Sequence, residues 1–473
     1  MTMRGAVEVS LCIALSTLAA CAGDSGDPGG PAGPSGPAPV ASIEVLAGSG
    51  EVGLDDTLRY SAVLRDARGN PLAGRAVSWR TADARLATVS PEGLVTGVAL
   101  GTTQVFAISE DVTGLADARI VFRLASISTK GGSHTCGLTA AGSAYCWGNG
   151  YEGKLGDGGT QFQPAPVRVL GGLRFTMLSV GGGHACGLIA GGAAYCWGGN
   201  ASGQLGDGTL VDRSAPTPVT GGFAFRHIDA GAIQTCGVTT SGQALCWGSN
   251  VWGGLGDGTT IDRSTPAPVP SSTEFQSVGS SLGHGCGLAT DGVAICWGRG
   301  DLGALGDGSG APTFRSGPVT GGHTFTRLTV GGLATCGLLA SGAALCWGDN
   351  RDGGLGNGTR ATSFEPVPVG GAIAFESIRV SSFTCGVDGD GVGYCWGGNN
   401  SGRLGDGTTD DRLVPAAVVG GHRFREIHAG SQHACGLDRD GVAWCWGNNG
   451  QGSLGIGDYT PPSPIPVRVV DPR

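Results

Sequence analysis

The sequence is poor in charged residues and above all in lysine. Charged residues make up 14% of the 473 residues, and lysine occurs only at Lys130 and Lys154. The formal net charge is -9, so the chain has no basic excess with which to attract nucleic acid, and we expect no nucleic-acid partner. Because so few side chains are charged, we expect many of them to lie between packed layers.

Sequence motifs for catalysis are also missing. The chain has no nucleophile elbow, phosphate-binding loop, zincin motif or pair of carboxylates that stands out from a repeated background. We therefore expect that the protein is not an enzyme, and we assign no catalytic residue and no cofactor.

The N-terminal apolar run, from Leu11 to Ala20, is too short to span a bilayer as a helix. It follows Arg4 and ends in Leu-Ala-Ala-Cys, an order typical of a signal peptide. The small residues before Cys21 resemble a bacterial lipobox, which implies cleavage before Cys21 and acylation of its thiol. We therefore interpret residues 1–21 as a lipoprotein signal peptide. We expect the protein outside the cytoplasm, lipid-anchored in the bacterial cell envelope at the outer membrane or the cell surface.

Two segments of different composition follow. Residues 22–39 are rich in glycine, proline and serine and are typical of a linker. Residues 40–124 change to short alternating runs separated by turn signals, which predicts a β-sandwich. The segments "VSWRTAD", "ATVSPEGLVTG" and Gly101-Thr102 resemble the group 2 bacterial immunoglobulin-like family. That resemblance implies a small Ig-like sandwich used as a spacer or adhesion module on bacterial surface proteins.

A unit of about 50 residues is repeated seven times in the rest of the chain. Each copy contains Cys-Trp-Gly, with a second cysteine ten positions before it. Four short β-rich pieces recur, for example at 165–170, 175–180, 184–188 and 193–198. Four antiparallel strands per unit predict an all-β fold in which residues 125–473 form a seven-bladed β-propeller, since radial closure leaves few exposed sheet edges.

The C-terminal strand is predicted to close the ring. If a block like "PVRV" opens each unit, the seventh block, at 465–470, follows the last Cys-Trp-Gly with no hairpin behind it. We therefore predict that this strand pairs into the first blade, beside the strand near residues 124–128.

The repeat also carries a family resemblance. The segment "GGGHACGLIAGGAAYCWGGNASGQLGDGT", residues 181–209, resembles the regulator of chromosome condensation repeat, and weaker copies cover residues 125–473. The resemblance implies a seven-bladed propeller, and its known function implies guanine-nucleotide exchange on a small GTPase. The paired cysteines depart from the nuclear members of that family.

The paired cysteines lie opposite each other if a hairpin is centred on Ala141. Directly opposed residues have Cβ atoms about 4.5–5.5 Å apart, which is compatible with a disulfide. In this register Cys136 and Cys146 share one face of the hairpin, while Trp147 points to the other. The predicted disulfides are Cys136–Cys146, Cys186–Cys196, Cys236–Cys246, Cys286–Cys296, Cys336–Cys346, Cys385–Cys395 and Cys435–Cys445.

Metal binding is the alternative use of these cysteines. A histidine stands two positions before the first cysteine in four units, at His134, His184, His284 and His433. The other three units keep both cysteines but have Gln234, Ala334 and Phe383 at that position, and a tetrahedral site needs four converging ligands. We therefore favour disulfides and predict no metal site. The histidines are interpreted as turn residues that hydrogen-bond neighbouring backbone.

The "LGDG" elements place an aspartate in a tight turn of most units. Calcium is not favoured, because Asn357 and Ile456 replace the aspartate in two units and no unit supplies several oxygen ligands. We predict Asx-type turns instead. We expect cross-strand or loop salt bridges to account for the Asp-Arg pairs at Asp212/Arg213, Asp262/Arg263 and Asp411/Arg412.

Side chains vary most between units in the long loop after each Cys-Trp-Gly. Aromatic and arginine residues are common anchors at binding interfaces, so we predict partner binding by Tyr151, Trp252, Leu302 and Arg351. The predicted function is that of a non-enzymatic, monomeric envelope lipoprotein whose propeller binds a protein or surface glycan. Two alternatives remain: a GTPase regulator, which export would separate from its substrate, and a propeller like the secreted members of the same family that inhibit β-lactamases.

Overall fold

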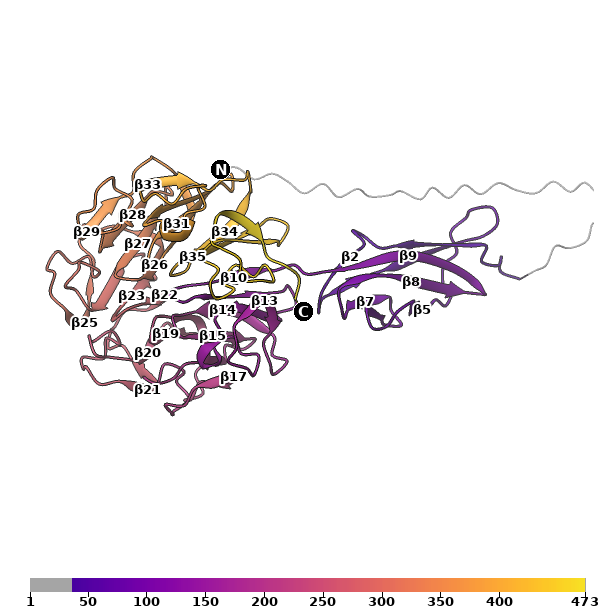
Figure 1. The fold of residues 1–473 in the computed structure, drawn as a ribbon. Coiled ribbons are helices and arrows are strands. Elements are labelled where there is room, and N and C mark those ends of the chain that lie inside the picture. The colour runs from indigo at the N-terminus through magenta and orange to yellow at the C-terminus, as the bar shows by residue number, and fades with distance from the viewer. Residues whose placement is uncertain (1–35, 473) are drawn as a thin grey trace, which may run out of the picture.

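The structure is a computed structural model that describes residues 36–472. The proposed signal peptide, Cys21 and most of the linker lie outside this range. Figure 1 shows two parts, an elongated sandwich and a ring of blades, joined end to end. The regular elements of residues 36–472 are strands, apart from two short 3-10 turns, η1 (Tyr151–Gly153) and η2 (Asn400–Gly402). No helix in this range is long and apolar enough to cross a membrane.

The sandwich contains nine strands. One sheet has the order β2-β9-β8-β5, a second has β3-β7-β6, and β1 pairs with β4. In β8 the buried residues alternate with more exposed ones, which confirms the alternating pattern of the sequence. The strands are β1 (Ser42–Leu46), β2 (Glu51–Gly53), β3 (Thr57–Arg59), β4 (Ser61–Arg65), β5 (Ser78–Thr81), β6 (Ala87–Val89), β7 (Leu94–Gly97), β8 (Gly101–Ser109) and β9 (Val112–Val121).

The ring consists of seven four-stranded antiparallel blades, as the sequence predicts. Each blade is formed by four consecutive strands. Blade 1 contains β10 (Ser126–Ser128), β11 (His134–Leu138), β12 (Ala144–Gly148) and β13 (Gln163–Arg168); blade 2 contains β14 (Phe175–Val180), β15 (His184–Ile189), β16 (Ala194–Gly198) and β17 (Arg213–Pro218); blade 3 contains β18 (Phe225–Ala230), β19 (Gln234–Thr239), β20 (Ala244–Gly248) and β21 (Arg263–Pro268); blade 4 contains β22 (Phe275–Ser280), β23 (His284–Ala289), β24 (Ala294–Gly298) and β25 (Thr313–Pro318). Blade 5 contains β26 (Phe325–Gly331), β27 (Ala334–Leu339), β28 (Ala344–Gly348) and β29 (Ser363–Pro368); blade 6 contains β30 (Phe375–Val380), β31 (Thr384–Asp388), β32 (Gly393–Gly397) and β33 (Arg412–Ala417); blade 7 contains β34 (Phe424–Ala429), β35 (His433–Asp438), β36 (Ala443–Gly447) and β37 (Ser463–Arg468). The first strand of each blade lines a central channel.

The predicted exchange of the C-terminal strand into the first blade is wrong. β37 is the outer strand of blade 7, where it pairs with β36, and β10 pairs only with β11. The "PVRV" block therefore ends a blade instead of opening one. Blades 7 and 1 meet as any two neighbours do, through packed faces and a backbone hydrogen bond, here of 2.9 Å from the N–H of Leu124 to the carbonyl of Gly441, whose equivalent is present at the other junctions.

Every contact between neighbouring blades has the same composition. The disulfide of one blade packs against the tryptophan of Cys-Trp-Gly in the next blade. For example, Cys286 and Cys296 lie in a buried cluster with Trp347. The Nε1 of Trp347 also donates a 3.0 Å hydrogen bond to the carbonyl of Ala304 in the preceding blade. The tryptophan of every Cys-Trp-Gly has an exposed fraction of 0%. The cysteine and the tryptophan of each Cys-Trp-Gly therefore point to opposite faces of the blade, as the alternation of a strand predicts.

The seven predicted disulfides are all present in the structure. In the first hairpin Cys136 lies opposite Cys146 and Gly137 opposite Tyr145, which is the register expected from a turn centred on Ala141. The same register recurs in the other six hairpins. The bonds are Cys136–Cys146, Cys186–Cys196, Cys236–Cys246, Cys286–Cys296, Cys336–Cys346, Cys385–Cys395 and Cys435–Cys445.

Three of the four histidines before the cysteines, His184, His284 and His433, form side-chain contacts between blades, not the expected turn contacts to backbone. His184 Nε2 lies 2.8 Å from Thr235 Oγ1 of the next blade, and the Thr235 hydroxyl donates to the carbonyl of Gln204 at 2.8 Å. Because the hydroxyl proton is used on that carbonyl, the histidine Nε2 is the donor in this pair. His433 makes the equivalent 2.8 Å contact to Thr135, which links blade 7 to blade 1.

His134 lacks this partner, because Ala185 occupies the position of the threonine. Neither ring nitrogen of the buried His134 has a hydrogen-bond partner among the described residues. We predict that Ala185→Thr raises the free energy of unfolding by about 1 kcal/mol by giving His134 a hydroxyl acceptor. Chemical denaturation measures the change. Ala434→Thr is the matched control, since the facing residue there is Phe383, and an equal gain in that variant would contradict the explanation.

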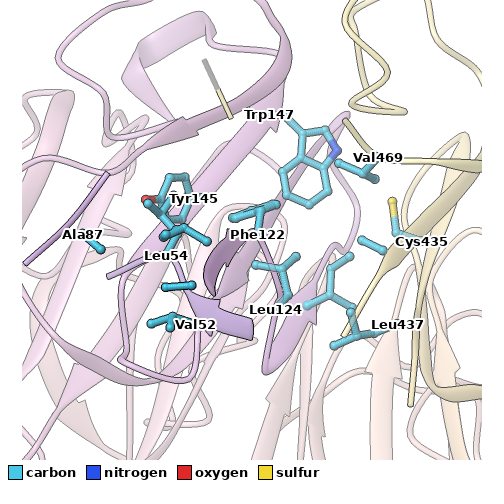
Figure 2. Packing of buried hydrophobic residues seen from close by; sticks show 14 of the residues in the cluster. Val52, Leu54, Ala87, Phe122, Leu124, Tyr145, Trp147, Cys435, Leu437 and Val469 are labelled. Carbon is cyan, nitrogen blue, oxygen red and sulfur yellow. The ribbon is translucent and has the colours of Figure 1, made fainter. Parts of the chain in front are cut away.

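The sandwich and the propeller share one hydrophobic core. Figure 2 shows Tyr145 and Phe122 between Leu54 of the sandwich and Trp147 of blade 1. The Tyr145 hydroxyl donates to Asp55 Oδ2 at 3.0 Å, and Arg168 pairs with Asp55 at 3.2 Å. Burial, with the nearby Asp55 charge, raises the pKa of Tyr145, so its hydroxyl stays a donor. The sandwich is therefore docked on blades 1 and 7 and not merely tethered to them.

Candidate functional site

The long loops after Cys-Trp-Gly are held rigid by a buried asparagine. Asn200 Nδ2 donates to Asp207 Oδ1 and to the carbonyls of Thr209 and Val211, at 3.1 to 3.2 Å. Its Oδ1 accepts the backbone N–H of Leu205 at 2.9 Å. Asn250 and Asn399 make the same set of bonds in their blades. These loops therefore present their exposed side chains from a fixed backbone.

The aspartate of "LGDG" forms the predicted Asx-type turn. Asp207 Oδ1 accepts the backbone N–H of Thr209 at 2.9 Å. Burial raises the pKa of Asp207, but hydrogen bonds from Thr209 and Arg213 outweigh it, so this pKa lies below its ordinary value. No group of three or more histidine, cysteine, aspartate or glutamate residues within 36–472 could hold a metal ion.

The arginines of the Asp-Arg dipeptides form the predicted loop salt bridges, but with the "LGDG" aspartates and not with their own neighbours. Arg213 pairs with Asp207 at 2.9 Å, and its neighbour Asp212 instead accepts the backbone N–H of Asn200 at 2.7 Å. Arg263 and Arg412 likewise pair with the "LGDG" aspartates Asp257 and Asp406. Adjacent residues of an extended strand point to opposite sides, so each member of the dipeptide finds a different partner.

Four exposed apolar side chains gather at blades 3 and 4 on the face that carries the long loops. We call Ile233, Val251, Trp252 and Leu282 the apolar patch. Trp252 is 47% exposed and Leu282 is 47% exposed. Trp252 lies against the turn of the next blade, because Gly283 there is so close that a Cβ would stand 2.8 Å from Trp252 Cδ1. The Arg299 guanidinium lies 4.9 Å from the Trp252 ring centroid, a cation–π contact.

A groove of about 220 Å³ continues from this patch across blades 5 and 6. Leu282 belongs to both, and Leu333, Asp349, Arg351 and Phe383 also line the groove. Arg351 Nη2 lies 2.6 Å from Asp349 Oδ2, and the Arg351 side chain is 69% exposed. We call the apolar patch and the groove together the long-loop site. It combines an exposed aromatic anchor, aliphatic side chains and a charged pair, the composition typical of interface anchors.

The structure brings two of the four predicted binding residues into the long-loop site. Trp252 belongs to the apolar patch, and Arg351 lines the groove. Tyr151 is 63% exposed but lies in η1 of blade 1, outside the residues that line the groove. Leu302 is half-buried in the long loop of blade 4 and does not line the groove either.

Sequence reasoning missed Ile233, Leu282 and Leu333, which lie in the short turns before the histidine position. The predicted binding residues were all taken from the long loops, where side chains vary between units. A signal was available, since Ile233 and Leu333 stand where other units have Ser133, Gly183 or Ser382. An apolar residue in a turn that is otherwise small and polar indicates an exposed surface used for contact.

Comparison with known proteins agrees with the fold. Models described as "Regulator of chromosome condensation (RCC1) repeat" match residues 141–188, 191–238, 241–289, 341–389 and 390–437, with a second such model at 125–154 and 424–453. A model described as "Bacterial Ig-like domain (group 2)" matches residues 40–119. No curated protein sequence matches this chain significantly.

Solved structures of similar fold include two from eukaryotes. Prp20p from Saccharomyces cerevisiae is 21% identical with a TM-score of 0.64, covering 71% of this chain and 87% of its own. Human WBSCR16 is 19% identical with a TM-score of 0.63, covering 70% and 94%. At these identities the likeness shows the seven-bladed fold alone. The repeat models, however, match more than half of the sequence, so the chain belongs to the regulator of chromosome condensation (RCC1) repeat family.

Proposed function

We propose that this protein is a non-enzymatic cell-envelope lipoprotein whose propeller binds a partner protein through the long-loop site. The observation that carries the proposal is the exposed pair Trp252 and Leu282 beside the groove that contains Arg351. Large apolar side chains left in water on a rigid loop are stabilised when a partner covers them. The sandwich serves as the spacer between the anchor at Cys21 and the propeller.

The seven disulfides support a location outside the cytoplasm. Disulfides persist in oxidising compartments and are rare in the reducing cytosol. The match to a bacterial Ig-like domain supports the same location, since such domains are typical of surface proteins. The lipobox at Cys21 adds the means of attachment.

A protein partner is favoured over a glycan. The Prp20p structure is described together with that protein's binding properties to Gsp1p and histones, which are both proteins. The long-loop site also offers an aromatic ring already covered on one side by Arg299, together with aliphatic groups. GTPase regulation and β-lactamase inhibition would also need a protein-binding face, but no feature of the long-loop site favours either one.

The test is a pull-down from envelope extracts with the full, lipid-processed protein. We expect the wild type to enrich a specific protein, and the double variant Trp252→Ser with Leu282→Ser to bind it at least about 10-fold more weakly. Leu115→Ser is the matched control, because Leu115 is 53% exposed on the sandwich and far from the site. Equal recovery by the double variant, or capture of glycan alone, would refute the proposal.

A further inference from the structure

The central channel is a second cavity, separate from the long-loop site. Its volume is about 560 Å³, and the first strands of the blades line it. Alternate residues of these strands face the channel, because successive side chains of a strand point to opposite sides. The channel-facing residues include His227 and Asp229 of β18, Arg327 of β26, Arg379 of β30 and His428 of β34. The lining therefore combines charged and polar side chains with apolar ones.

The channel is bridged at the mouth on the long-loop face by the turn at residues 129–132. Lys130 Nζ lies 2.6 Å from Asp229 Oδ2 and 2.7 Å from the carbonyl of Ser280, in blades 3 and 4. The backbone N–H of Gly131 donates to Ser381 Oγ of blade 6 at 3.2 Å. A turn of blade 1 thus reaches across the ring. A ligand would enter by the opposite mouth, where the hairpin turns lie.

The carboxylate that lines the channel, Asp229, and the nearby carboxylate of Glu426 are both already occupied. Asp229 pairs with Lys130, one of only two lysines in the chain. Glu426 accepts the backbone N–H of Ile127 at 3.1 Å and lies 3.3 Å from His428 Nε2. Burial raises the pKa of Glu426, but His428 and the charge of Arg379 outweigh it, so Glu426 stays ionised.

Two guanidinium groups on neighbouring blades form no direct ion pair with a described carboxylate. Among residues 36–472, no carboxylate oxygen lies within 4.0 Å of Arg327 or Arg379. Arg379 donates one hydrogen bond, of 3.0 Å, to the carbonyl of Ile378. Among the residues that line the channel, three cations (Lys130, Arg327 and Arg379) therefore accompany one carboxylate, that of Asp229, although the whole chain carries a net charge of -9.

We propose that this channel binds a small oxyanion, a phosphate or carboxylate group, with Arg327 and Arg379 as its ligands. A guanidinium group presents a planar set of N–H donors that matches both oxyanions. Arg379 is half-buried among the channel strands, where charge-assisted hydrogen bonds are stronger than in open water. Thr329, which also lines the channel, adds a hydroxyl donor. The site needs no partner protein and does not depend on the proposed function.

Isothermal titration of the full protein tests the proposal, with inorganic phosphate and with succinate as separate probes. We expect saturable one-to-one binding of at least one probe. The probe that binds more tightly shows whether the site prefers a phosphate or a carboxylate group. Arg379→Gln and Arg327→Gln are each expected to weaken it about 10-fold or more. Arg315→Gln is the matched control, because Arg315 is exposed on the outer strand β25 and should leave binding unchanged.

A variant with the opposite effect guards against misfolding of the arginine variants. Asp229→Asn removes a channel carboxylate and frees the charge of Lys130, so binding is expected to become several-fold tighter. The channel site is refuted if the folded wild type binds neither probe saturably. It is also refuted if Arg315→Gln weakens binding as much as Arg379→Gln, or if Asp229→Asn weakens it.

Discussion

The propeller is expected to lose its fold when its seven disulfides are reduced, whereas the sandwich keeps its own. Each bond joins cysteines ten positions apart, and the chain-entropy model gives about 2–3 kcal/mol for so short a loop. Seven such contributions together exceed the roughly 5–15 kcal/mol by which typical domains are stable. The sandwich, residues 40–124, contains no cysteine and should keep its fold, with a lower stability because it loses the core that it shares with blades 1 and 7.

Calorimetry of protein refolded with and without reductant measures this effect. The oxidised protein should show a propeller transition that is missing from the reduced protein, while the sandwich transition persists in both. Removing a single disulfide should have a smaller effect. Replacing Cys286 and Cys296 by alanine should lower the free energy of unfolding by about 3 kcal/mol, because the pair also packs against Trp347. A reduced protein with an unchanged propeller transition would contradict the account.

Acid is expected to destabilise the propeller steeply below about pH 6.5. The histidines before the cysteines have exposed fractions of 0% to 1%, and burial lowers the pKa of His184 to about 3, of His284 to about 3 and of His433 to about 4. Above pH 6.5 these side chains are neutral in both the folded and the unfolded protein, so their protonation does not affect the free energy of unfolding. As pH falls below 6.5, the unfolded chain takes up protons that the folded chain cannot, so stability is lost down to about pH 3.

Denaturant unfolding at a series of pH values checks the slope. Each buried histidine should contribute about 1.4 kcal/mol per pH unit within this window. His184→Gln offers a matched variant, since Gln234 occupies the same position in the next blade. This substitution should reduce the slope of stability against pH by the contribution of one histidine, about 1.4 kcal/mol per pH unit. A slope that is the same in this variant would show that His184 does not carry the effect.

The features that repeat along the chain could be predicted from the sequence. A spacing of ten between cysteines fixes the hairpin register, and the alternation of a strand then puts Cys146 and Trp147 on opposite faces. The start of a blade could not be predicted in this way, because a cyclic repeat has no marked beginning. The connection from β13 to β14 is nearly as short as the turns from β10 to β11 and from β11 to β12, and shorter than the loop from β12 to β13, so loop length does not mark β37 as an outer strand.

The contacts that cross from one blade to another were also missed. His184 contacts Thr235 of the next blade, and Lys130 contacts Asp229 across the ring. The partners in each pair are far apart in the sequence, so no local sequence pattern predicts the contact. Leu282 and Leu333 join the long-loop site only because the turns and the long loops share one face of the ring. Trp252 and Arg351 were predicted from variation between repeats, which indicates contact residues wherever the repeated scaffold is rigid.

Photo-crosslinking in cells tests the central claim, that the long-loop site binds a partner protein, most directly. A photoreactive amino acid would replace Trp252 in the full protein, and another copy would carry it at Leu115 on the sandwich. The account predicts a discrete protein adduct from position 252 that is absent from position 115. The same adducts from both positions, or none from position 252 in a protein that is exported and folded, would contradict it.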